Sequence, residues 1–226
     1  MRLGSFYGFE YAYREQGCDE YQLRQNPAAL LIPEFESSID DVIIDVGAHI
    51  GSFSIPASRL VPQGRVHALE PCNSSFLYLT KNIAMNSIPN VIPYQLALSD
   101  KKSRMRLNYY PDDTEFGDQN WGNTLTKEFD EGEEVQTDTL PNFLKDQMIT
   151  DCAFMKLNCE GSEFEILLGT PTEYLRKTDL YLVLYHLDLN EHHTVDELIW
   201  HFESNGFKTQ MRNKEQKRGW LIAKKT

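Results

Sequence analysis

The amino-acid sequence predicts an α/β protein whose mostly parallel sheet is covered by helices on both faces. From residue 42 onward, short apolar segments typical of buried strands alternate with segments of helical periodicity. The chain has 226 residues, of which 41% are hydrophobic and 12% aromatic, so it is long enough for one α/β core and short for two. We therefore expect one main domain over residues 41–226, preceded by a lead-in or lid over residues 1–40.

The elements of the main domain follow one another in a regular order. Strands are predicted at 42–46, 65–69, 91–96, 153–157 and 180–185, and helices at 52–60, 74–85, 139–147, 162–168 and 194–205. Gly206 directly follows the last helix and is expected to end it. Two further strands, at about 206–211 and 219–224, are expected to form a hairpin. Residues 1–40 lack a clean period, apart from a short helix expected at 28–35.

The segment Asp45-Val-Gly-Ala-His-Ile-Gly51 follows the first apolar strand directly. Its glycines allow a ligand to approach the backbone where a Cβ would collide, and Glu70, one βα unit later, can accept hydrogen bonds from both hydroxyls of a ribose. Together these features predict a nucleoside site. The glycines are spaced G-x-x-x-G rather than G-x-G-x-x-G, and no G-x-x-x-x-G-K-[ST] occurs, which argues against NAD, FAD, ATP and GTP.

Five motifs in a fixed order resemble the FkbM-type methyltransferases of the class I S-adenosylmethionine-dependent superfamily. They are residues 42–51, Leu69-Glu70-Pro71, Ala97-Leu98-Ser99-Asp100, residues 135–140 and residues 155–163. The resemblance implies S-adenosylmethionine as the cofactor. It also implies a Rossmann-like sandwich around a mostly parallel seven-stranded sheet, with the strand order 3-2-1-4-5-7-6 and a C-terminal antiparallel strand.

The same resemblance assigns cofactor contacts to residues at the carboxyl ends of the predicted strands. It implies that Glu70 holds the ribose and that Gly47 and Gly51 leave room for the methionine part. Asp45 would anchor the turn and face the amino group of the cofactor, or it would only cap the following helix. The remaining cofactor residues implied are Ala48, His49, Pro71, Ala97, Leu98 and Ser99, of which the last three would border the adenine.

Three residues are candidates for the chemistry: His186, Glu160 and Asn158. His186 follows the strand at 180–185 and can act as a base near neutral pH, while Glu160 lies in a turn just before Gly161. The family usually carries aspartate where this chain has Asn158, and an amide can neither act as a general base nor supply a negative ligand. We expect methylation of a hydroxyl on a small molecule or glycan, and the alternative is a non-catalytic cofactor-binding or regulatory protein.

Residues 105–135 interrupt the alternation of strands and helices and contain much of the negative charge. Long excursions of this kind commonly form lids or substrate loops, and we expect Tyr109 or Trp121 to line the acceptor side. The alternative is a disordered acidic loop. A divalent metal held by Glu160, Asn158 and Asp188 is chemically conceivable, but no ligand spacing demands it and we expect no metal.

Charge and cysteine usage restrict the partners. The net charge of −12 disfavours nucleic acid, because binding to phosphates requires cationic side chains. The four cysteines show no C-x-x-C spacing and are expected to be reduced thiols. No apolar signal core or membrane-length stretch is present, which predicts a cytoplasmic protein without a membrane partner. Assembly into a homo-oligomer is left open.

Overall fold

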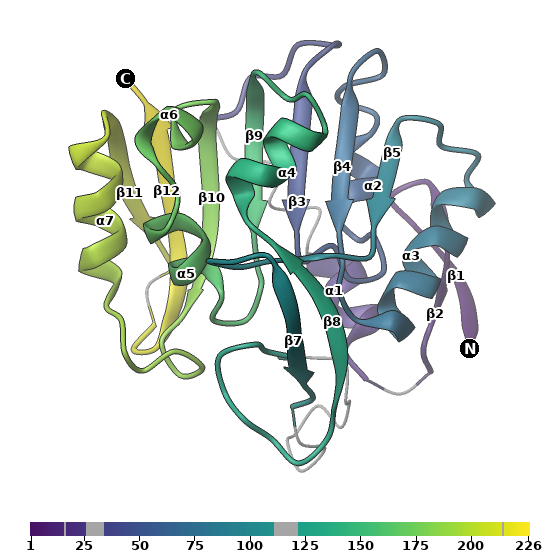
Figure 1. Ribbon diagram of the computed structural model, residues 1–226. Coiled ribbons are helices and arrows are strands. Elements are labelled where there is room, and N and C mark those ends of the chain that lie inside the picture. Colours follow the sequence, from purple (N-terminus) through teal and green to yellow (C-terminus); the bar gives the residue numbers. More distant parts are fainter. Residues whose placement is uncertain (16, 26–33, 111–121, 214) are drawn as a thin grey trace.

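A computed structural model describes residues 1–15, 17–25, 34–110, 122–213 and 215–226. Its centre is a seven-stranded sheet (Figure 1), with the order β11 (Phe207–Arg212), β12 (Arg218–Lys225), β10 (Thr178–His186), β9 (Cys152–Leu157), β3 (Val42–Val46), β4 (Arg65–Leu69) and β5 (Val91–Tyr94). The five strands from β10 to β5 run parallel, whereas β12 pairs antiparallel with both β10 and β11. The predicted fold class, strand order and C-terminal antiparallel strand are thus confirmed.

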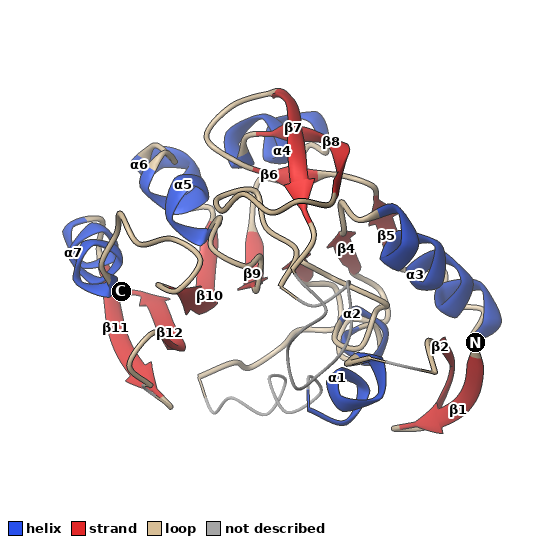
Figure 2. Ribbon diagram, turned by 90° about the horizontal axis from the view of Figure 1, so that it is seen from below, coloured by secondary structure: helices blue, strands red, loops and turns tan. Residues whose placement is uncertain are grey.

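Helices cover both faces of this sheet (Figure 2). One face carries α4 (Leu140–Asp146), α5 (Glu163–Leu168), α6 (Thr172–Leu175) and α7 (Val195–Ser204), and the other carries α2 (Ser54–Ala57) and α3 (Asn73–Met85). Because side chains alternate along a strand, Phe154 of β9 packs into the α2 side and Met155 into the α4 side. The helix expected at 52–60 is reduced to the single turn of α2.

The N-terminal segment is more regular than its sequence suggested. It forms a hairpin of β1 (Arg2–Phe6) and β2 (Phe9–Tyr13), followed by α1 (Asp19–Gln25). Every second residue of β2 is a buried aromatic residue in the core that includes α2 and α3, and this period of two is typical of a strand. The side chain of Asn82 in α3 bonds both the N–H and the carbonyl of Ala12, at 2.7 and 3.1 Å. The helix expected at 28–35 lies mostly outside the described residues.

A second, three-stranded sheet lies beyond the carboxyl ends of the parallel strands (Figure 1). It consists of β6 (Ala97–Leu98), β8 (Gly132–Asp138) and β7 (Ser103–Asn108), in that order. Both ends of the segment 105–135, expected as an excursion from the alternation of strands and helices, lie in strands, which pair as β7 and β8. Within the described part of the chain, every helix is too short or too polar to cross a bilayer.

Candidate functional site

The glycine turn after β3 is held close to the ends of two neighbouring strands. Gly47 has a φ of +82°, and a Cβ on it would lie 2.0 Å from the carbonyl oxygen of Asn158. The N–H groups of Gly47 and Ala48 donate to the carbonyl of Leu69 at 3.0 and 2.9 Å. Only glycine fits at position 47, because any side chain would collide with the backbone after β9.

Asp45 lies beneath this turn and does not line the cavity described below. Its carboxylate is fully buried, lies 2.7 Å from the ammonium of Lys156 and accepts a hydrogen bond from Ser54 Oγ at 2.5 Å. The Lys156 ammonium also reaches the carbonyl of Gly47 at 3.4 Å. The ion pair therefore fixes both the turn and the start of α2.

Glu70 follows β4 and points its carboxylate into the cavity. Oε2 accepts a hydrogen bond from the N–H of His49 at 2.8 Å, and Oε1 accepts one from the N–H of Cys72 at 2.9 Å. Burial raises the pKa of the Glu70 carboxyl, although His49 and the two backbone donors oppose that shift. Each oxygen has a further lone pair, so the carboxylate can still accept two hydroxyl groups from a ligand.

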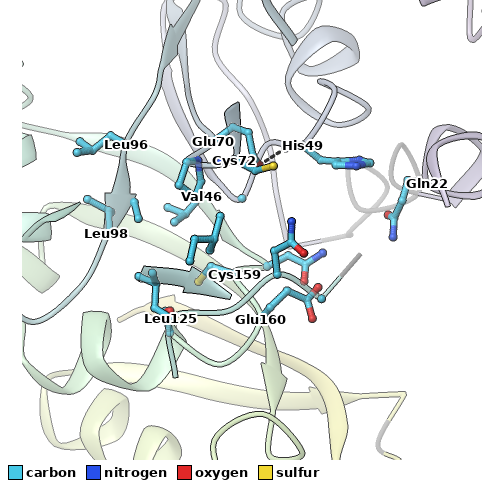
Figure 3. Close-up of a pocket in the computed structure, with 18 of the residues that line it drawn as sticks. Gln22, Val46, His49, Glu70, Cys72, Leu96, Leu98, Leu125, Cys159 and Glu160 are labelled. Atoms are coloured by element: carbon cyan, nitrogen blue, oxygen red, sulfur yellow. Dashed lines mark hydrogen bonds between the residues drawn. The ribbon is translucent and has the colours of Figure 1, made fainter. Parts of the chain in front are cut away.

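Apolar side chains form the wall of the cavity next to Glu70. Leu96 and Leu98 lie together on one side of it (Figure 3), and Ala97 and Leu107 complete this wall. Pairing of β6 with β8 fixes the position of Ala97 and Leu98. Ser99 bonds through its N–H to Asp138 at 2.9 Å and does not line the cavity. The wall suits a flat apolar heterocycle.

Polar side chains at the end of β9 form another wall. Asn158 and Glu160 both line the cavity, and Asn158 Oδ1 and Glu160 Oε2 are buried without hydrogen-bond partners among the described residues. Glu160 has a left-handed φ of +50°, and Thr124 Oγ1 donates to its carbonyl at 2.6 Å. Buried acceptors nearly always have donors, so the unpartnered oxygen of Asn158 suits a ligand that donates a hydrogen bond.

His186 ends β10 and lies behind this polar wall. It is fully buried and does not line the cavity. Its Nε2 is 3.2 Å from Glu160 Oε2, and its Nδ1 is 3.1 Å from Glu163 Oε1. Burial alone would lower the pKa of His186, but the carboxylates of Glu160 and Glu163 raise it above its ordinary value.

Residues 122–127 cover the polar side of the cavity. Gly122, Asn123 and Leu125 line it, and Lys127 bonds the carbonyl of Asp188 at 3.2 Å. The Asp188 carboxylate accepts hydrogen bonds from the Arg218 guanidinium at 2.6 to 3.1 Å. Both of its oxygens are therefore already paired with a positively charged side chain. Tyr109 does not line the cavity, and Trp121 lies outside the described residues.

The N-terminal segment closes the side of the cavity near His49. Cys18 and Gln22 line the cavity, and Asp19, fully buried, accepts hydrogen bonds from the Arg14 guanidinium at 2.7 to 3.2 Å. The same guanidinium lies 2.8 Å from Nε2 of His49. Burial would raise the pKa of Asp19, but His49 and Arg14 hold it well below its ordinary value. Cys18, Asp19 and His49 lie close enough together to hold a cation, and the Arg14 guanidinium contacts two of them, Asp19 and His49.

Replacing Arg14 with alanine is expected to weaken binding of S-adenosylhomocysteine by about threefold to tenfold, which corresponds to roughly 1 kcal/mol. The loss of Arg14 leaves the buried Asp19 carboxylate without its cation. Because Asp19 is the first residue of α1, the packing of α1 beside the cavity should become less stable. Calorimetry measures the affinity. Arg2→Ala is the matched control, because the Arg2–Glu15 pair is exposed and worth little. Equal affinities in the two variants would contradict a role for the N-terminal segment in binding.

The cavity opens to solvent, and the empty space within it and at its open mouth together amounts to about 780 Å³. Eight of the residues predicted for the site line it: Gly47, His49, Glu70, Pro71, Ala97, Leu98, Asn158 and Glu160. Five do not: Asp45, Ala48, Gly51, Ser99 and His186. Gly51 instead packs on α2 and α3, where a Cβ would lie 3.0 Å from the side chains of Ile55 and Leu79.

Sequence reasoning missed eleven of the lining residues: Cys18, Gln22, Val46, Cys72, Leu96, Leu107, Gly122, Asn123, Leu125, Cys159 and Ser162. Val46, Cys159 and Ser162 lie inside the predicted motifs, and Cys72 and Leu96 directly flank a motif and could have been found by extending it by one residue. Cys18 and Gln22 carry no signal in the sequence, because the fold of the N-terminal segment brings them to the cavity.

The donor set and shape of the cavity fit S-adenosylmethionine. A buried carboxylate suits the ribose diol, and the leucine wall suits the adenine. The unpartnered oxygen of Asn158 lies at the same cavity and can accept a hydrogen bond from the ligand.

Comparison with solved structures shows the same fold. The chain matches a precorrin-6y C5,15-methyltransferase from Geobacter metallireducens with a TM-score of 0.56 and 18% identity, covering 96% of this chain and 94% of that one. It also matches TrmK from M. capricolum, solved with S-adenosylhomocysteine, with a TM-score of 0.53 and 13% identity over 91% and 68% of the two chains. At these identities the likeness concerns the fold alone.

Sequence comparison identifies the family. "Methyltransferase 1" of Beauveria bassiana is 28% identical over 190 residues, which are 70% of this chain and 76% of that protein. The 31-O-demethyl-FK506 methyltransferase FkbM of Streptomyces tacrolimicus is 27% identical over 185 residues, 71% and 68% of the two proteins. The model of the methyltransferase FkbM domain matches residues 45–209. The chain therefore belongs to the FkbM family of methyltransferases, for which S-adenosylmethionine is the methyl donor.

Proposed function

We propose that the protein methylates a hydroxyl group of a small molecule or sugar. The observation that carries this proposal is the Glu160 carboxylate in the cavity wall, of which one oxygen, Oε2, lies 3.2 Å from His186 behind the wall. A hydroxyl must lose its proton when its oxygen is methylated, and a carboxylate within hydrogen-bond reach is a suitable base. When bound, S-adenosylmethionine supplies an electrophilic methyl group, so the protein's own residues have to orient the acceptor and remove that proton.

Named residues would divide this task. Glu70 would bind the ribose hydroxyls, Leu96 and Leu98 would contact the adenine, and Asn158 would accept a hydrogen bond beside the acceptor. His186 is the other candidate base. Glu160 is favoured because it lines the cavity, whereas His186 lies behind it.

The charge of the cavity supports a neutral or cationic acceptor. Glu70 and Glu160 are acidic, and none of the described residues that line the cavity is lysine or arginine. A phosphate-rich substrate such as RNA would meet like charge there instead of the cations it needs. The Streptomyces relative is named as a methyltransferase of 31-O-demethyl-FK506, which supports an oxygen acceptor on a small molecule.

The test is transfer of label from methyl-labelled S-adenosylmethionine to a panel of probes. The panel contains methyl glucoside, catechol and cyclohexanol as neutral hydroxyls, benzylamine as an amine, and glucose 6-phosphate as an anion. We expect label on a neutral hydroxyl, and a rate at least about 100-fold lower in Glu160→Gln, the usual range for loss of a general base. Glu173→Gln, an exposed change on α6, is the matched control.

Two other results would contradict the proposal. Label only on the amine or the phosphate would exclude O-methylation of a neutral acceptor. Tight binding of S-adenosylhomocysteine with no label on any probe would favour the second candidate, a cofactor-binding regulatory protein, which is the function suggested by the presence of Asn158 where the family usually has aspartate.

A further inference from the structure

We propose that Glu163 and His186 form a buried positioning pair that holds the Glu160 carboxylate toward the cavity, so that Glu160 is the base and His186 acts only through it. The inference rests on the proposed function and deepens it, because it assigns separate roles to the two candidate bases. It starts from three residues on two elements, the turn into α5 and the end of β10.

Glu163 fixes the backbone on both sides of Glu160. Its Oε1 accepts a hydrogen bond from the N–H of Cys159 at 2.8 Å, and its Oε2 accepts one from the N–H of Gly161 at 2.9 Å. Burial would raise the pKa of Glu163, but His186 and the backbone donors hold it below its ordinary value. Glu163 is therefore a carboxylate at neutral pH. Its two backbone hydrogen bonds hold the left-handed turn at Glu160 in place.

His186 connects Glu163 to the side chain of Glu160. Its two ring nitrogens lie 3.1 and 3.2 Å from one oxygen of each carboxylate. A neutral imidazole has a single N–H and would turn a lone pair toward one of these carboxylates, whereas an imidazolium offers a donor to both. The other charges near the ring are Arg218, which opposes its protonation, and Asp188, which neutralises Arg218. The geometry therefore favours the imidazolium.

His186 and Glu160 are in close contact, but their atoms are not aligned for a hydrogen bond. Nε2 of His186 and Oε2 of Glu160 are 3.2 Å apart, and both are buried atoms without a hydrogen bond among the described residues. Contacts between catalytic groups are often poorly aligned before the substrate binds and improve in the complex. A small rotation of Glu160 would give one oxygen to His186 and leave the other to the acceptor hydroxyl.

The charges of the proposed step balance. The acceptor oxygen would form a bond to the methyl carbon as the bond between that carbon and the donor sulfur breaks. The acceptor O–H bond breaks and its proton moves to the Glu160 carboxylate, which becomes a neutral carboxylic acid and later releases the proton to solvent. The negative charge lost at Glu160 matches the positive charge that the donor loses as the methyl group leaves its sulfur. His186 keeps its two protons throughout, between Glu163 and Glu160, and so acts as a fixed positive charge.

The first test needs no acceptor. Long-range ¹H–¹⁵N NMR of the full chain with S-adenosylhomocysteine reports whether each ring nitrogen of His186 carries a proton, from pH 6 to 9. We expect both to be protonated at pH 7.5, and the midpoint of the titration to fall in Glu160→Gln and in Glu163→Gln. A neutral His186 at pH 7.5 in the parent, or a midpoint unchanged in Glu160→Gln, would overturn the proposal.

The second test uses whichever hydroxylated probe the parent methylates. In His186→Gln we expect kcat to fall about tenfold to 100-fold, less than in Glu160→Gln, with the acidic limb of the pH profile of kcat shifted to higher pH. The shift follows because the carboxylate is easier to protonate once the adjacent positive charge is gone. The affinity for S-adenosylhomocysteine should stay within about threefold of the parent, which also shows that the variant is folded.

The matched control is His67→Gln, a change at a buried histidine of β4 whose ring contacts Tyr94 outside the cavity. It should leave the pH profile unchanged. A loss of rate in His186→Gln as large as in Glu160→Gln, without a shift of the acidic limb, would show that His186 is itself the base. If no probe is methylated, the proposed function fails, and the NMR experiment alone then decides whether the buried pair exists.

Discussion

Replacing Glu70 with alanine is expected to weaken binding of S-adenosylhomocysteine by about 100-fold or more. The carboxylate is buried at the cavity, and two hydrogen bonds from ribose hydroxyls to a charged acceptor are worth about 1.5–3 kcal/mol each. Because the pKa of Glu70 is raised by burial, the affinity of the parent should also fall as the pH drops through that pKa. Isothermal calorimetry at neutral and acidic pH measures both effects.

The control for this prediction is Glu173→Ala, which removes an exposed carboxylate on α6 and should leave the affinity unchanged. Glu70→Gln is a second variant that keeps the shape of the side chain and removes its charge. Parent-like affinity in both Glu70 variants would mean that the nucleoside is held elsewhere and that the site has been assigned wrongly.

Replacing Lys156 with methionine is expected to lower the free energy of unfolding by about 3–5 kcal/mol, the cost of leaving one charge of a buried pair alone. Both Lys156 and its partner Asp45 are buried, and their nitrogen and oxygen lie 2.7 Å apart. The pair also supports the glycine turn, so cofactor binding should weaken together with stability. Urea unfolding followed by circular dichroism gives the free energy.

Two further variants separate this ion pair from a general effect of losing a lysine. Lys102→Met removes a lysine that is 66% exposed and bound to Asp138, and it should cost less than about 1 kcal/mol. The double variant Asp45→Asn with Lys156→Met leaves no buried charge and should be more stable than Lys156→Met alone. A double variant that is no more stable would indicate that packing of the Lys156 chain, rather than its charge, matters.

Much of the fold could be predicted because its signals are local. The apolar runs at 42–46 and 65–69 are strands, as expected, and Glu70 and Gly47 line the cavity because the strand ends that carry them meet at one edge of a parallel sheet. These residues owe their position to the secondary structure around them. A pattern within about ten residues was therefore enough to place them.

The rest of the site depends on contacts between segments that are distant in the sequence. Arg14 and Asp19 reach His49 only because the N-terminal hairpin packs on α3, and no local pattern encodes that contact. His186 illustrates a different limit. Its place at a strand exit suggested a residue open to the acceptor, but the fold places Glu160 and Glu163 at its two ring nitrogens and leaves the ring without solvent exposure.

The most direct test of this account is a crystal structure of the protein with S-adenosylhomocysteine. We predict that both ribose hydroxyls will donate to the Glu70 carboxylate, that the adenine will lie against Leu96 and Leu98, and that the sulfur will face the wall formed by Asn158 and Glu160. A ribose bound away from Glu70, or a sulfur turned away from Glu160, would contradict the proposed site and the role of Glu160 as its base.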